Sequence, residues 1–192
     1  ASQDPAVQRI APRLVASLDR AINLTEATLA FGRAEEPAPK LTRVSLRGLV
    51  EDVFENERLG DDSDKIAYSC DVAPALALRA DPEQPYRVLA NLVRNARLAI
   101  AAKGGDGRIH IAGRDSDDGW EIEVSDTGPG LPQKALDHLF KPFHGGVRKG
   151  GSGLGLAICA ELIKGHGGQL ELIRTGPEGT VFRICIPVGL AA

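Results

Sequence analysis

The stretch Asn91-Leu92-Val93-Arg94-Asn95-Ala96 (residues 91–96) lies in the middle of a segment with strong helical periodicity, residues 86–102. Asn91 and Asn95 are four residues apart, so both amides project from one face of the helix. An amide carbonyl is a neutral hard-oxygen ligand, suited to Mg²⁺ when phosphate oxygens and waters complete an octahedron. Two solvated or capping amides are the alternative interpretation. The apolar residues expected on the buried side of this helix are Val88, Leu89, Leu92, Val93 and Ala96.

A second segment, Asp126-Thr127-Gly128-Pro129-Gly130-Leu131, directly follows a predicted strand. A carboxylate at a strand end can accept a hydrogen bond from an exocyclic amine such as adenine N6. Gly128 and Gly130 allow the backbone to approach a flat ring closely. A simple tight turn is the alternative.

The third segment, Gly151-Ser152-Gly153-Leu154-Gly155-Leu156, opens a predicted helix. Backbone N–H groups at a helix N-terminus can bind phosphate oxygens, and the helix dipole favours their negative charge. The segment lacks both the Gly-Lys-Ser/Thr ending of a P-loop and the Rossmann spacing. It therefore indicates a different nucleotide-binding fold.

Two phenylalanines, Phe140 and Phe143, lie between the second and third segments and precede a glycine-rich basic stretch, residues 144–153. This pattern is typical of an anchored hinge under a lid. Arg148 and Lys149 belong to that lid, and we expect them to reach the β- or γ-phosphate of a nucleotide.

Upstream, apolar residues at 3-4 spacing over residues 7–31 predict a helix with a face wide enough for a helical bundle. Packing of that helix on its own domain is the alternative. A proline-containing linker follows. The predicted organisation is 1–34 bundle helix, 35–42 linker and 43–192 main domain.

Beyond the linker, strand and helix patterns alternate irregularly. The expected strands are residues 44–46, 65–72, 76–80, 108–113, 120–125, 169–174 and 180–187. The expected helices are residues 49–59, 86–102, 132–140 and 154–164. Such an order is not that of a parallel doubly wound sheet. It favours an α/β fold, a two-layer sandwich with a mixed β-sheet in one layer and helices in the other.

The composition of the chain argues against several classes of protein. The chain has 192 residues, 43% of them hydrophobic, and a net charge of −3 without a long basic run. This argues against nucleic acid as a partner, and no stretch is apolar enough to cross a membrane. The cysteines, Cys70, Cys159 and Cys185, are distant from one another and suggest neither a disulfide framework nor a metal cluster.

Taken in order, the segments at 91–95, 126–130, 140–143 and 151–155 resemble the N, G1, F and G2 boxes of sensor histidine kinases of two-component systems. Gly179-Thr180 is similar to a late element of the wider superfamily that includes gyrase, Hsp90 and MutL. The resemblance spans residues 44–187. It implies the Bergerat-type (GHKL) ATP-binding fold, with ATP and Mg²⁺ as ligands.

The resemblance also implies the roles of individual residues. Asn95 would hold Mg²⁺, Asp126 would bind adenine N6, and Thr180 would support the adenine. The residues expected to bind ATP are Asn91, Asn95, Ala99, Asp126, Gly128, Gly130, Phe140, Phe143, Arg148, Lys149, Gly151, Ser152, Gly153, Leu154, Gly155, Leu156 and Thr180.

One departure concerns the positions just after the second asparagine. Many members carry a basic or aromatic pair there, and this chain has Leu98 and Ala99. Triphosphate charge must then be met by the lid residues, or by Arg94 or Arg97.

The second departure is the missing phosphoacceptor. None of the four histidines, His110, His138, His144 and His166, precedes the linker or is followed by an acidic residue. His166 follows a predicted helix end, where a role with the helix dipole is expected. Because the chain also begins without a methionine, we expect the first helix of the phosphotransfer hairpin to lie upstream.

The implied function is a histidine kinase that transfers the γ-phosphoryl group of Mg-ATP to a histidine outside this fragment, and then to a response regulator receiver domain. A homodimer through the N-terminal helix, a cytoplasmic location, and no contact with nucleic acid or membrane are expected. Two alternatives are a non-catalytic adaptor, disfavoured by the intact boxes, and an ATPase of the gyrase or Hsp90 type. The absence of glutamate from residues 86–102 disfavours the latter.

Overall fold

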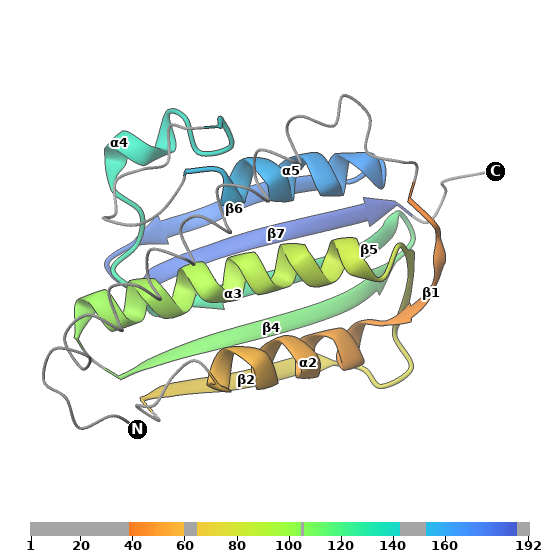
Figure 1. Ribbon diagram of the computed structural model, residues 1–192, viewed down its shortest axis with the longest axis horizontal. Coiled ribbons are helices and arrows are strands. Elements are labelled where there is room, and N and C mark those ends of the chain that lie inside the picture. Colours follow the sequence, from red (N-terminus) through yellow and green to blue (C-terminus); the bar gives the residue numbers. More distant parts are fainter. Residues whose placement is uncertain (1–38, 60–64, 105, 143–152, 188–192) are drawn as a thin grey trace, which may run out of the picture.

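The computed structural model describes residues 39–59, 65–104, 106–142 and 153–187 (Figure 1). The predicted bundle helix and the first half of the linker, residues 35–38, lie outside these residues. The elements are β1 (Thr42–Ser45), α2 (Leu46–Leu59), β2 (Ile66–Val72), β3 (Ala77–Ala80), α3 (Glu83–Lys103), β4 (Gly107–Ser116), β5 (Gly119–Asp126), α4 (Gln133–Leu136), α5 (Gly155–Gly165), β6 (Gln169–Gly176) and β7 (Gly179–Pro187).

Five strands form one mixed sheet in the order β2-β4-β5-β7-β6, in which β2 is parallel to β4 and the other pairs are antiparallel. Figure 1 shows α2, α3 and α5 side by side on one face of this sheet, with α3 in the middle. A separate antiparallel ladder joins β1 to β3. The predicted two-layer α/β sandwich is confirmed. None of the described helices is long and apolar enough to span a membrane.

Alternation along the central strands explains why the described helices lie on one face of the sheet. Ile111 of β4 lies opposite Val124 of β5, which in turn lies opposite Phe182 of β7, and all three are buried. Their sequence neighbours, such as Glu123 and Arg183, point to the other face. Successive side chains of a strand point to opposite faces, so this pattern builds an apolar layer under the helices and a polar layer beyond them.

Helix α3 is the central element of the helical layer. It begins at Glu83, three residues before the predicted start, with Pro82 as its N-cap residue and Pro85 in its first turn. Proline is tolerated there because the first N–H groups of a helix have no partner within the helix. The helix ends at Lys103 and is capped by Gly104, whose φ of 77° is left-handed and whose N–H bonds to the carbonyl of Ala101. The predicted stop is thus confirmed.

The segment after the second motif differs from its prediction. Only Gln133–Leu136 is α-helical, whereas a helix had been expected over residues 132–140. The chain continues through turns, with hydrogen bonds from Leu139 N to Leu136 O and from Lys141 N to His138 O. Pro142 disfavours a helical conformation of Lys141 just before it, so the segment does not continue as a helix into residue 142.

His166 directly follows α5 as its C-cap residue, at the helix end where the sequence placed it, and its side chain is buried and hydrogen-bonded. Its side chain is 0% exposed. Nδ1 lies 2.9 Å from the carbonyl oxygen of Leu162, and Nε2 accepts a hydrogen bond from the N–H of Asp81 at 3.2 Å. Only the neutral tautomer with hydrogen on Nδ1 satisfies both contacts. The imidazole therefore joins the end of α5 to the start of α3.

Candidate nucleotide-binding site

The two asparagines of α3 face the first turn of α5. Asn95 Nδ2 donates a hydrogen bond to Asn91 Oδ1 at 3.4 Å. A Cβ atom placed on Gly155, the first residue of α5, would lie 2.6 Å from Asn91 Oδ1. A distance that short is below van der Waals contact, so the helix start can approach the asparagine only because residue 155 lacks a side chain. The first and third motifs therefore lie next to each other in the fold.

A second group of predicted residues meets at the end of β5. Asp126 lies directly opposite Thr180 of β7, and its Oδ1 accepts a hydrogen bond from the N–H of Gly128 at 2.7 Å. A Cβ on Gly128 would lie 2.8 Å from that carboxylate oxygen and 3.1 Å from the Cβ of Ala99 on α3. The carboxylate of Asp126, the backbone at Gly128 and the small side chain of Ala99 therefore pack directly against one another.

Close backbone contacts hold this end of the sheet together. Gly130 has a φ of 77°, and a Cβ there would lie 2.4 Å from the carbonyl oxygen of Gly176. Gly179 has a φ of 127°, and its Cβ would overlap the carbonyl oxygen of Asp126. Both glycines are needed for their conformation and for their close packing. The turn after β5 and the β6–β7 hairpin are therefore joined through their backbones.

Thr175 is part of this arrangement, although the sequence motifs did not reveal it. Its Oγ1 accepts a hydrogen bond from the N–H of Leu131 at 2.7 Å and lies 3.3 Å from Oγ1 of Thr180. Thr180 itself is only 5% exposed. The threonine pair connects the second motif to β7. The one feature of the sequence that could have indicated this pair is the short hairpin that places residues 175 and 180 opposite each other.

Lys103, in the last turn of α3, was also missed. Its Nζ donates to the carbonyl oxygens of Thr127 at 3.4 Å and Pro177 at 3.3 Å. The ammonium group therefore links α3 to both loops that border Asp126. Nothing in the local sequence distinguishes this lysine from any cation at a helix C-terminus.

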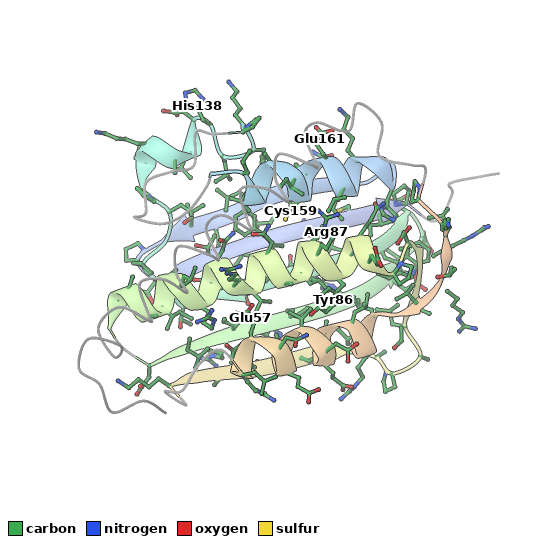
Figure 2. All side chains as sticks on the ribbon, viewed as in Figure 1. Glu57, Tyr86, Arg87, His138, Cys159 and Glu161 are labelled. Carbon is green, nitrogen blue, oxygen red and sulfur yellow. The ribbon has the colours of Figure 1, made fainter. Side chains whose placement is uncertain are left out.

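Arg97 does not face the asparagines. Its Nε is 2.6 Å from Glu57 Oε2 of α2, and the two side chains are only 18% and 15% exposed. Figure 2 shows Glu57 and Tyr86 between α3 and α2, and Arg87 and Cys159 between α3 and α5. Arg97 is therefore on the α2 side, which removes it from the candidates for triphosphate binding.

The remaining predicted residues divide into two groups. Among those described, Gly153 has a φ of 70°, Leu154 is 0% exposed, and Phe140 and Leu156 are half-buried against the core. The predicted residues that lie outside the described part of the chain are Phe143, Arg148, Lys149, Gly151 and Ser152.

The donor groups present suit Mg²⁺ bound together with a nucleotide. Within residues 39–59, 65–104, 106–142 and 153–187, no cluster of three or more His, Cys, Asp or Glu side chains could hold a metal alone. Amide oxygens on α3 are hard neutral ligands, and Mg²⁺ usually keeps several waters and phosphate oxygens. The hydrogen bond from Asn95 Nδ2 to Asn91 directs the other amide atom of Asn95, its carbonyl oxygen, away from Asn91. The amide oxygen of Asn95 is therefore suited to be one protein ligand of such an ion.

Comparison with known proteins identifies the family. Residues 80–190 match the model of the family described as Histidine kinase-, DNA gyrase B-, and HSP90-like ATPase. The chain belongs to this family. As a member of this ATPase family the chain is expected to bind ATP, and its resemblance to the catalytic domain of sensor histidine kinases is confirmed.

Curated relatives of this ATPase domain are sensor kinases. The sensory histidine kinase/phosphatase NtrB of Salmonella typhimurium is 32% identical over 96% of this chain and 54% of its own length. The sensor histidine kinase ZraS of Escherichia coli is 34% identical over 59% of this chain and 23% of its own length. The chain thus spans about half the length of the NtrB relatives that it matches, which are 54% covered.

Solved structures of histidine kinases are also similar to this chain. Full-length ShkA in complex with AMPPNP has a TM-score of 0.78 and 26% identity, covering 100% of this chain and 41% of that one. Histidine kinase ThkA in complex with the response regulator protein TrrA has a TM-score of 0.75 and 25% identity, covering 98% of this chain and 53% of that one. The fold is that of a two-component histidine kinase catalytic domain.

Proposed function

We propose that this ATPase domain is the nucleotide-binding part of a protein histidine kinase. In this proposal it transfers the γ-phosphoryl group of Mg-ATP to a histidine outside residues 1–192, from which the group passes to an aspartate of a response regulator. The observation that carries the proposal is the meeting of the asparagine pair, the first turn of α5 and the Asp126–Thr180 pair around α3.

Adenine recognition is assigned to the end of β5. The Asp126 carboxylate accepts a hydrogen bond from the exocyclic amine, and the glycine at position 128 leaves that carboxylate uncovered by a side chain. Thr180 supports the carboxylate side from the opposite strand. A guanine ring presents a carbonyl oxygen at the position of that amine, so this pairing selects adenine.

Triphosphate binding is assigned to the asparagine face of α3 and the start of α5. Asn95 would hold Mg²⁺, which would offset the negative charge of the triphosphate. Arg94 follows Asn91 by three residues and so stays on the same side of α3, unlike Arg97. The lid cations Arg148 and Lys149 remain candidates for the γ-phosphate.

The chain acts mainly by positioning groups. An imidazole nitrogen of the acceptor attacks the γ-phosphorus in line, the N–P bond forms, and the bond from phosphorus to the leaving oxygen of ADP breaks. The nitrogen proton is released to solvent. No glutamate lies on α3 after Glu83 in its first turn, so the helix carries no base opposite the asparagines for activating water.

The proposed binding partners of this chain are inferred from its relatives. ThkA has been solved together with a response regulator, which supports a receiver domain as the partner of this chain. The predicted helix 1–34 and linker 35–42 would form half of a dimerisation hairpin, located in the cytoplasm. Neither nucleic acid nor membrane contact is expected of this chain.

Calorimetric titration with nucleotides tests the binding site. Asn95→Ala should weaken Mg-ATP binding but change metal-free ATP binding little. Asp126→Asn should reduce the preference for ATP over GTP. If Asn95→Ala bound Mg-ATP as tightly as the wild type, the metal assignment would be wrong, and unchanged base selectivity in Asp126→Asn would refute the adenine assignment.

A second assay tests transfer. The domain is mixed with γ-labelled ATP and a separately produced phosphotransfer hairpin carrying the acceptor histidine. Acid-labile label on the hairpin supports the kinase, whereas release of free phosphate alone supports an ATPase. A domain that binds Mg-ATP and yields neither product would indicate the adaptor.

A further inference from the structure

The β1–β3 ladder holds two arginines directly opposite each other. Arg43 of β1 pairs in register with Arg79 of β3, and both side chains are exposed. Neither forms a hydrogen bond or ion pair through its side chain with any residue that the structure describes. Like charges directly opposite in a ladder are unfavourable. By contrast, Arg114 and Arg183 on the main sheet each contact a glutamate of β5.

A hollow lies beside these arginines. Its volume is about 290 Å³, and its lining includes Arg43, Arg79, Leu41 and Trp120. Trp120 is the only tryptophan of the chain, and it is partly buried against the core. The surface therefore combines an aromatic and aliphatic floor with two guanidinium groups that lack a counter-charge among the described residues.

This surface is separate from the nucleotide site. Trp120 is near the start of β5 and Asp126 is at its end, so the two lie at opposite ends of one strand. The hollow instead adjoins β1, which follows the predicted linker directly. A partner seated here would not contact the asparagines of α3 or the first turn of α5.

We propose that Arg43, Arg79 and Trp120 form a docking surface for an acidic protein segment in which an apolar side chain is flanked by carboxylates. Each guanidinium offers a planar fork that can bind a carboxylate with two hydrogen bonds. The apolar side chain enters the hollow against Trp120 and excludes water around it. Such a partner supplies the negative charge that the ladder lacks. The proposal does not depend on ATP binding or on phosphoryl transfer.

Trp120 fluorescence tests the proposal directly, because no other tryptophan contributes to the signal. The whole chain is titrated with acetyl-Asp-Glu-Leu-Glu-Asp-amide and with its uncharged match, acetyl-Asn-Gln-Leu-Gln-Asn-amide. The acidic peptide should change the emission saturably, and binding should weaken as ionic strength rises to about 0.15 M. The uncharged peptide should give no saturable change.

Arg79→Glu is the decisive variant. It places a glutamate opposite Arg43, so the ladder gains an opposite-charge pair and should keep its fold. Affinity for the acidic peptide should fall about tenfold. Lys65→Glu, which makes the same change of charge just before β2, should bind like the wild type.

Four results would overturn the proposal. They are no saturable signal with the acidic peptide, equal binding of the uncharged peptide, unchanged affinity in Arg79→Glu with native circular dichroism, and displacement of the peptide by inorganic phosphate at comparable concentration. The last result would identify a phosphate site in place of a protein-docking surface. Mg-ATP titration of the same samples reports separately on the nucleotide site.

Discussion

Substitution of Gly155 by alanine should separate nucleotide binding from folding. The new Cβ would lie 2.6 Å from Oδ1 of Asn91, 2.9 Å from its Nδ2 and 3.1 Å from its Cγ. Ordinary contact begins near 3.4 Å, so the amide of Asn91 must move by about 0.8 Å. The obstacle is the end of a side chain, which can rotate, and residue 155 has no left-handed φ. The fold should therefore accept the alanine.

The two consequences differ in size. Alanine in a helix is favoured over glycine by about 0.5–1 kcal/mol, and disturbing the long hydrogen bond between Asn91 and Asn95 costs about the same. The free energy of unfolding should thus stay within about 1 kcal/mol of wild type. Loss of an interaction with a charged ligand costs about 1.5–3 kcal/mol, so Mg-ATP should bind about 10–150 times more weakly.

Urea unfolding and calorimetric titration measure these two quantities on one preparation. Gly165→Ala is the matched control, because Gly165 ends the same helix and a Cβ there would meet no atom within 4 Å. It should bind Mg-ATP like the wild type. If Gly155→Ala also kept full affinity with unchanged stability, Asn91 and the start of α5 would not form the phosphate end of the site.

Three further predictions concern stability. Arg97→Met should lower the free energy of unfolding in urea by about 1.5–3 kcal/mol, because it leaves Glu57 half-buried without its cation, yet it should leave Mg-ATP affinity unchanged. Burial raises the pKa of Cys159 from its usual 9.0 to about 12, so the unfolded chain loses this proton first as pH rises. Between these two pKa values the free energy of unfolding should fall by up to ~1.4 kcal/mol per pH unit. Cys159→Ala should remove this contribution to the pH dependence measured by urea unfolding. An equal pH dependence in the variant would contradict a raised pKa of Cys159. Gly130→Ala should lower the free energy of unfolding by about 1–3 kcal/mol, because the alanine would adopt a left-handed φ and its Cβ would meet the backbone of Gly176. An unchanged thermal midpoint would contradict this close contact.

Helix and strand positions were largely predictable because they depend on local periodicity. The buried face of α3 follows from Val88, Leu92 and Ala96, and the helix stop follows from Gly104. The helix expected over residues 132–140 was wrong beyond Leu136, where apolar spacing alone did not indicate the turns that form. The motif residues Asn91, Asp126 and Gly155 could be singled out as candidates because each belongs to a contiguous sequence motif.

Contacts between distant segments were beyond the reach of the sequence. It left Arg94 and Arg97 equivalent as triphosphate ligands, and only the packing of α2 beside α3 showed that Arg97 is held by Glu57. It gave Thr175 and Lys103 no signal, because their role depends on carbonyl and hydroxyl groups brought close by the β6–β7 hairpin.

The sequence by itself determined the element order, the motifs of the family and the candidate residues for nucleotide binding, since these depend on residue type and short-range spacing. Tertiary structure alone decided that Arg97 faces α2, that the buried side chain of His166 bonds to the backbone of Asp81, and that Arg43 lies opposite Arg79. The physical reason is that strand register and helix packing are set by the whole buried core, through contacts between residues far apart in the chain.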